Sequence, residues 1–153
     1  MSSALEKTRR RSWRFWLFVL SPMLVLGTCS VFVIKSFRAL GPAQEQAAAF
    51  HQRFEAGQYA AIYAGASPEF QRDTTREALQ RYLQGIRDRM GKCTPPPGKP
   101  DSYFANSSSS GTTIRLSYSL QCSNGHLDEV ITFLSEDGMP KLFQYQASSR
   151  FLK

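Results

Sequence analysis

Glu129 is the residue whose position in the sequence most clearly suggests chemistry. It lies among alternating apolar residues, and a tight turn at Asn124-Gly125 would place it opposite Leu120 on the apolar face of a hairpin. With Tyr118 or Tyr145 nearby, a carboxyl group buried there could donate or accept a proton, so these three residues form a candidate ligand pocket. In the alternative, Glu129 lies at a strand end or on a bulge, and its carboxylate reaches solvent without a chemical role.

Two cysteines, Cys93 and Cys122, lie in the region that would carry this pocket. An even pair in an oxidising compartment most simply forms a disulfide, which would stabilise a small domain by roughly 3 to 4 kcal/mol. The alternative is a catalytic thiol with His51 or His126 as its base. No His and Cys residues show the paired spacing of a zinc site, so we expect no metal and no cofactor.

Helical patterns fill the first half of the region after residue 42. The range 43–56 is rich in Ala, Gln and Glu, and Gly57 is placed to end a helix there. A second, short helix is expected over residues 59–64. Ser67 and Pro68 then suit the cap and the first position of another helical turn.

The best-marked helix follows Thr74. Thr74 and Glu77 have the spacing of a capping box, and Gly91 is placed to close the helix. Core-forming residues repeat at helical spacing in between: Leu79, Tyr82, Leu83 and Ile86.

The chain changes character at Cys93, where residues 94–100 include four prolines and a glycine. The remainder of the chain predicts strands, because apolar and polar residues alternate over 114–122 and turn signals lie at 107–111, Asn124-Gly125 and Asp137-Gly138. The first hairpin would pair Cys122 with Leu127, Leu120 with Glu129, Tyr118 with Ile131 and Leu116 with Phe133. We therefore expect an α+β domain with three helical segments packed on a curved antiparallel sheet of about four strands.

An apolar run from Phe15 to Ile34 precedes this domain. Its twenty residues contain no charge, enough for a helix to cross a bilayer, and Lys7 and four arginines lie on its N-terminal side. We expect a cytoplasmic tail over residues 1–14, a transmembrane helix over 15–34, a linker over 35–42 and an exported domain over 43–153. This arrangement corresponds to a single-pass protein of a bacterial inner membrane, with its domain in the periplasm.

Three other interpretations of this segment are open. A cleaved signal peptide would have a shorter apolar stretch followed by a small-residue cleavage site. A lipoprotein signal would use Cys29, but Thr28 fits poorly before it and the apolar run continues after it. A twin-arginine export signal would use the arginines at 9–11, which also serve as an ordinary positive flank.

The net charge of the chain, +7, is concentrated in its N-terminal part. Residues 1–38 hold seven of the nineteen basic residues and one of the twelve acidic ones, which leaves twelve and eleven for the remainder. The exported domain is thus nearly neutral and lacks the basic stripe that nucleic acid requires.

The helical half of the domain resembles a known pattern. The residues that carry it are Phe50 to Tyr59, Ile62-Tyr63, Ser67 to Phe70, Thr74-Thr75, Leu83, Arg87 and Met90-Gly91. They resemble the opening of small bacterial envelope domains of unknown function, which are similar to the cystatin-like or nuclear transport factor 2-like (NTF2-like) cone fold of ketosteroid isomerase and the SnoaL cyclases. The resemblance covers residues 43–150 and implies a concave sheet that can hold a small ligand, form a homodimer or dock a partner.

Function does not come with this resemblance. Isomerase-type members need a carboxylate base inside the cone, and no acid of the helical part matches one. We expect a non-enzymatic envelope protein, associated with the lipid bilayer, whose domain binds another envelope or membrane protein. The alternative is a small-ligand-binding or cyclase/isomerase-like enzyme that uses the interior of the cone, and an open cavity with converging polar groups would favour it.

Overall fold

The computed structural model describes residues 40–152, except 95–97, 137 and 151. All described residues belong to one compact unit. The predicted tail and membrane span lie outside them, as does most of the predicted linker. Among the described residues, no helix is both long enough and apolar enough to cross a membrane.

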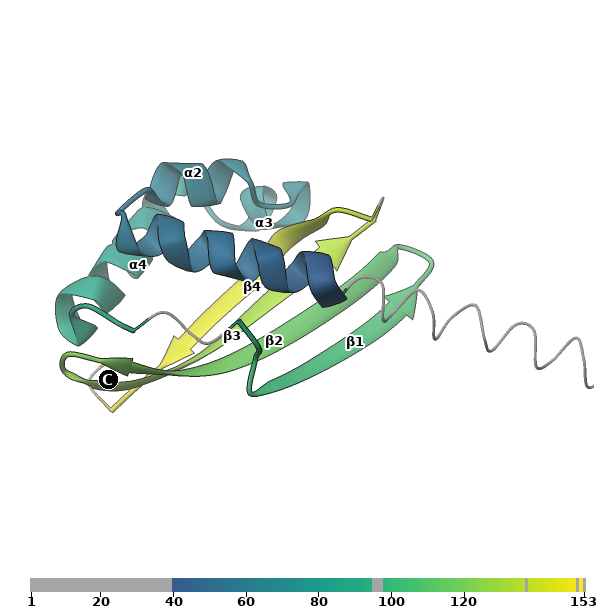
Figure 1. The fold of residues 1–153 in the computed structure, drawn as a ribbon. Helices are drawn as coiled ribbons and strands as arrows, with labels where there is room; N and C mark the ends of the chain where they lie inside the picture. Colours follow the sequence, from purple (N-terminus) through teal and green to yellow (C-terminus); the bar gives the residue numbers. More distant parts are fainter. Residues whose placement is uncertain (1–39, 95–97, 137, 151, 153) are drawn as a thin grey trace, which may run out of the picture. The chain divides into compact units, whose positions relative to one another are not determined.

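A helix is described over residues 40–55, drawn in dark blue in Figure 1. Residues 40–42, which we expected to be linker, are therefore helical. Leu40 packs against the core and Ala43 is fully buried, and these contacts offset the low helix propensity of Gly41 and Pro42.

Two short helices come next, α2 (Tyr59–Ala64) and α3 (Pro68–Asp73), at the expected places. The Ser67 hydroxyl caps α3 by accepting a hydrogen bond from the Phe70 amide at 3.2 Å. This confirms Ser67 as the cap and Pro68 as the first helical residue.

The longest of the labelled helices is α4 (Arg76–Met90), and its predicted cap was one residue wrong. Thr75 caps α4 by accepting from the Ala78 amide at 3.2 Å, whereas Thr74 ends α3 with its amide bonded to the Phe70 carbonyl. Gly91 closes α4 at φ 70°, as expected. Tyr82 is 43% exposed and so is not the core residue that we predicted.

Four antiparallel strands form one sheet in the order β1-β2-β3-β4. They are β1 (Ser102–Ser108), β2 (Gly111–Cys122), β3 (Gly125–Ser135) and β4 (Pro140–Ser148). The sheet is curved and the helices lie against one of its faces (Figure 1). The predicted α+β class and the number of strands are confirmed.

The predicted register of the β2–β3 hairpin was wrong by two residues. Cys122 lies opposite Gly125, Leu120 opposite Leu127 and Tyr118 opposite Glu129. The chain turns on Ser123 and Asn124 because both are bonded to the end of α4, where the Asn124 amide group donates to the Arg89 carbonyl at 2.8 Å. A shift of two residues leaves every side chain on its predicted face, so Glu129 still points toward the apolar side.

A bulge in β4 sets the direction of Tyr145. Phe133 pairs with Leu142 but Thr132 pairs with Gln144, so Phe143 is an extra residue on the β4 side. As a result Leu142 and Tyr145 are both buried although they are three residues apart, an odd spacing that regular alternation would put on opposite faces.

Candidate functional site

Three polar side chains from three elements meet in the core, and we call them the polar cluster: His51, Glu129 and Tyr145. The Glu129 carboxylate lies between the other two. Its Oε1 contacts His51 Nε2, and its Oε2 accepts a hydrogen bond from the Tyr145 hydroxyl at 3.1 Å. Glu129 is only 2% exposed, so the interpretation in which it reaches solvent is wrong.

His51 enters the cluster because it lies on the buried face of the helix over residues 40–55. Ala47 and Phe54, four residues before it and three after it, are buried on the same side. Glu129 comes from β3, and the bulge in β4 directs Tyr145 toward it. The cluster thus depends on the packing of the helix against two neighbouring strands.

Tyr118 borders the cluster from β2. Its ring meets the His51 ring edge-on at a centroid distance of 5.4 Å. Burial, and secondarily the negative charge of Glu129, raises the pKa of Tyr118 to about 12. Burial first and Glu129 second also raise the pKa of Tyr145 well above its ordinary value. Both tyrosines therefore remain neutral phenols at neutral pH, and Tyr145 serves as a hydrogen-bond donor to the carboxylate.

The second ring nitrogen of His51, Nδ1, is buried and has no hydrogen-bond partner among the described residues. A small space of about 10 Å³ adjoins His51 and Glu129, and is lined also by Phe54, Leu120 and Leu127. A single water needs roughly 10 to 15 Å³ of such space. The space is therefore about the size of one water.

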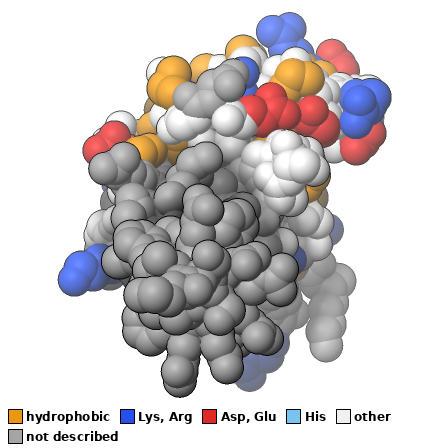
Figure 2. Space-filling view, turned by 90° about the vertical axis from the view of Figure 1, so that its right-hand side faces the viewer, with side chains coloured by type: hydrophobic (Ala, Val, Ile, Leu, Met, Phe, Trp, Pro, Cys, Tyr) orange, Lys and Arg blue, Asp and Glu red, His pale blue; other side chains and the backbone are white. Residues whose placement is uncertain are grey.

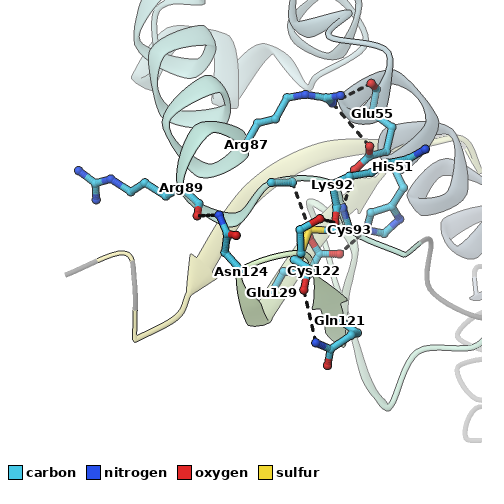
Figure 3. The surroundings of a disulfide bond; sticks show 12 residues. His51, Glu55, Arg87, Arg89, Lys92, Cys93, Gln121, Cys122, Asn124 and Glu129 are labelled. Atoms are coloured by element: carbon cyan, nitrogen blue, oxygen red, sulfur yellow. Dashed lines mark hydrogen bonds and ion pairs between the residues drawn. A yellow bond between two sulfur atoms is a disulfide. The ribbon is translucent and has the colours of Figure 1, made fainter.

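A disulfide lies beside this space, and Figure 3 shows it near His51 and Glu129. Cys93 and Cys122 are bonded to each other, and Cys93 forms part of the wall beside His51 and Glu129. The segment that carries Cys93 is fixed to β2 by the Thr94 amide, which donates to the Gln121 carbonyl at 2.9 Å. The expected disulfide is thus present, and its Cys93 lines the space beside the polar cluster.

Arg87 and Glu55 lie on the helix side of the disulfide and hold the segment around Cys93 in place. Arg87 donates to the Glu55 carbonyl at 2.7 Å, and its Nη1 lies 3.6 Å from the Glu55 carboxylate. The other Glu55 oxygen accepts from the Cys93 amide at 3.4 Å. These contacts join the end of the helix over 40–55 to α4 and to the disulfide, so this segment is held at both ends.

The geometry limits the chemistry of the polar cluster. Glu129 could pass a proton between His51 and Tyr145, because one carboxylate contacts both. A substrate must reach hydrogen-bond distance of such a group for catalysis, and the space beside it admits only about one water. In this arrangement the space beside the cluster is too small for a substrate.

The structure brings together all three residues of the predicted pocket, Tyr118, Glu129 and Tyr145, but adds His51 as the direct partner of Glu129. From the sequence, His51 was expected only as a possible base for a thiol. A signal was available, since His51 shares the helical face of Ala47, Phe50 and Phe54. Two polar residues on two predicted apolar faces are natural partners for each other.

A larger hollow lies elsewhere on the domain. It has a volume of about 270 Å³ and lies between the start of α3, the end of β3 and the start of β4, with Glu69, Glu136, Met139 and Lys141 in its wall. Met139 is 72% exposed, so this hollow is part of the surface. Within the described residues, no three His, Cys, Asp or Glu side chains are grouped so that they could hold a metal ion.

Comparison with known proteins gives no family for the chain. No protein-family model matches it, and no curated protein is significantly similar to it in sequence. The function must therefore be argued from the residues and their arrangement.

Proposed function

We propose that this chain is a membrane-anchored envelope protein whose exported domain binds a protein partner and does no catalysis. The observation that carries the proposal is the filled interior. Cavities that bind small molecules measure roughly 300 to 1,000 Å³, whereas the space beside Glu129 measures about 10 Å³. The buried polar groups are directed at one another, so they stabilise one arrangement of the core.

The proposed location rests on two independent features. The run from Phe15 to Ile34 has the length and the basic flank of a membrane anchor. The Cys93–Cys122 disulfide suits an oxidising compartment such as the periplasm. An anchor of this kind would raise the effective concentration of the domain toward partners in the same membrane.

The surface suits a protein partner better than nucleic acid. In Figure 2, acidic, basic and hydrophobic side chains are interspersed on the visible described part of the face. The region after residue 38 holds nearly equal numbers of acidic and basic residues. Nucleic-acid binding depends on a concentrated positive charge, which such a composition does not supply.

A second candidate is an enzyme of the NTF2-like kind, acting on a small ligand inside a cone. The contact of Glu129 with both His51 and Tyr145 favours it, because a carboxylate shared by an imidazole and a phenol is a plausible acid–base group. This candidate requires the space beside Glu129 to widen, since about 10 Å³ is too small for a substrate.

The test is chemical cross-linking of intact cells, followed by purification of the full-length protein from solubilised membranes. The proposal expects one envelope protein to be recovered in near-equal amount. A chain that ends after residue 42 is the control, because it retains the anchor and lacks the domain. A partner that binds the domain should not be recovered with this control.

A matched variant separates the two candidates. His51→Gln together with Glu129→Gln retains polar groups of similar size but removes the acid–base function. Partner recovery should be unchanged if the domain only binds. If no partner is recovered, and this variant folds but gives the phenotype of a gene deletion, then the enzyme candidate is correct and the binding proposal is wrong.

A further inference from the structure

Two buried polar atoms without a hydrogen-bond partner belong to residues that line the same small space. They are His51 Nδ1 and Glu55 Oε2, and neither has such a partner among the described residues. The two residues are four apart on the helix over residues 40–55, which puts their side chains on one face, and both line the space of about 10 Å³ beside the polar cluster. An unpaired polar atom inside a protein is costly, so two at one place indicate a partner that they share.

The neighbouring protein groups form their hydrogen bonds elsewhere. His51, which is 6% exposed, uses its other ring nitrogen, Nε2, for Glu129. Glu55 uses its other carboxylate oxygen, Oε1, to accept from the Cys93 amide at 3.4 Å. Arg87 Nη1 lies 3.6 Å from Glu55 Oε2 and donates instead to the Glu55 carbonyl at 2.7 Å. Both His51 Nδ1 and Glu55 Oε2 can therefore still form a hydrogen bond.

We infer that this space is a binding site for one water molecule, which bridges His51 Nδ1 and the Glu55 carboxylate. A buried water needs roughly 10 to 15 Å³ and typically makes about three hydrogen bonds. The space has about this size, and Thr94, which carries a hydroxyl, also lines it. The water thus has two polar partners on one helix and a hydroxyl in the wall as a third.

A water suits this place because it can both donate and accept. In the neutral ring of His51, the proton on Nε2 is bonded to the Glu129 carboxylate, and Nδ1 is an acceptor to which the water donates. In the protonated ring, Nδ1 is a donor and the water accepts from it. The water donates to Glu55 in both cases. A metal cation would instead be repelled by the Arg87 guanidinium beside the same carboxylate.

The bridge connects the polar cluster to the contacts around the disulfide. Through the water, His51 is joined to Glu55, which accepts from the Cys93 amide and pairs with Arg87. The orientation of the His51 ring is then fixed at both of its nitrogens, by Glu129 on one side and by the water on the other. This site does not depend on whether the domain binds a partner or acts as an enzyme.

The test is nuclear magnetic resonance of the full-length protein in detergent micelles, with its histidines labelled. The chain has two histidines, and the second, His126, is exposed on β3 and serves as an internal control. A water held beside Nδ1 moves with the protein, so its protons should show a nuclear Overhauser effect to the carbon-bound ring protons of His51. The ring of His126 meets rapidly exchanging water and should show none.

Two further variants exclude an imitation of this signal. Hydroxyl protons that exchange with water could produce the same effect, and Thr94 and Tyr118 both lie near His51. The effect should therefore persist in Thr94→Val and in Tyr118→Phe. If it disappears in either variant, the signal came from the hydroxyl and the inference is overturned.

A matched pair at Glu55 tests the bridge itself. Glu55→Met removes the carboxylate and keeps a side chain of similar length, so the effect at His51 should be lost. Glu55→Gln retains an oxygen that accepts from the water and should keep the effect. Arg87→Gln removes the ion pair but leaves the Glu55 carboxylate, and should keep it as well. Cooperative thermal unfolding shows which variants are folded.

The measurement on the unchanged chain decides the question even if Glu55→Met does not fold. The inference is overturned if His51 shows no contact with water, if His126 shows an equal one, or if a folded Glu55→Met retains the contact in full. None of these outcomes depends on recovery of a partner. A failure of this inference is therefore distinguishable from a failure of the proposed function.

Discussion

A functional site needs both reactive groups and access. The polar cluster and the edge strand β1 each have only one of these two properties. The cluster has reactive groups but no access, since His51, Glu129 and Tyr145 are all at most 9% exposed. The edge has access but no reactive group, since β1 consists of serines, two aromatics, alanine and asparagine. An enzyme needs both properties in one place, and a binding domain does not. The comparison thus favours binding at an exposed surface and a structural role for the cluster.

The largest effect is expected from breaking the cluster. Glu129→Leu would leave His51 Nε2 and the Tyr145 hydroxyl buried without an acceptor, so it should lower the free energy of unfolding by about 3 to 5 kcal/mol. Urea unfolding of the domain measures this. Adding His51→Leu and Tyr145→Phe removes the orphaned groups and should restore most of the loss. A loss below about 1 kcal/mol for Glu129→Leu would show that the cluster is not structural.

The next largest effect concerns the disulfide. Cys93 and Cys122 are 29 residues apart, and a loop of this size should contribute about 3 to 4 kcal/mol in the chain-entropy model. Replacing both cysteines by alanine should lower the free energy of unfolding by that amount, and the melting temperature should fall with it. Reductant should then have no further effect on the melting temperature. Cys29→Ser is the control and should leave the melting temperature unchanged. If reductant had the same effect on the melting temperature of the double variant as on that of the unchanged chain, this account would be contradicted.

The same replacement bears on access to the cluster. If the disulfide alone excludes solvent from His51, its removal should speed the reaction of His51 with a histidine reagent while the fold persists. Intact folding with no change in reactivity would show that Glu55 and Arg87 suffice to cover the site.

A smaller effect is expected at high pH. Burial raises the pKa of Tyr145 and of Tyr118 above the ordinary value of 10.0, so the unfolded chain loses these protons at lower pH than the folded one. Stability should therefore be constant below about pH 9 and fall as the pH rises above about 10. Urea midpoints across this range measure the slope. Tyr145→Phe and Tyr118→Phe should each make the slope shallower, and an unchanged slope in both would contradict the prediction.

The elements of this fold could be predicted where their signals are local. Ser67 and Pro68 define the start of α3 within one turn of chain, and alternation over 114–122 defines β2 without reference to anything distant. The register of the β2–β3 hairpin could not be derived in this way. It is fixed by Asn124 and Ser123, which bond to the end of α4 thirty residues or more away.

The site shows the same division. The face of Glu129 could be predicted, because a shift of two residues preserves alternation. The direction of Tyr145 depends on the β4 bulge at Phe143, for which we identified no local signal. The pairing of His51 with Glu129 joins residues 78 apart, so only the packing of a helix on the sheet reveals it.

The smallest effect on stability is expected at the edge. Tyr103→Ser and Phe104→Ser remove side chains that are already half exposed or more, so each should change the free energy of unfolding by less than about 0.5 kcal/mol. Leu116→Ser, one strand inward and fully buried, is the contrast, and should destabilise the domain strongly. If Phe104→Ser destabilised the isolated domain as much as Leu116→Ser, β1 would belong to the core, and the distinction between a buried interior and an exposed outer strand would fail.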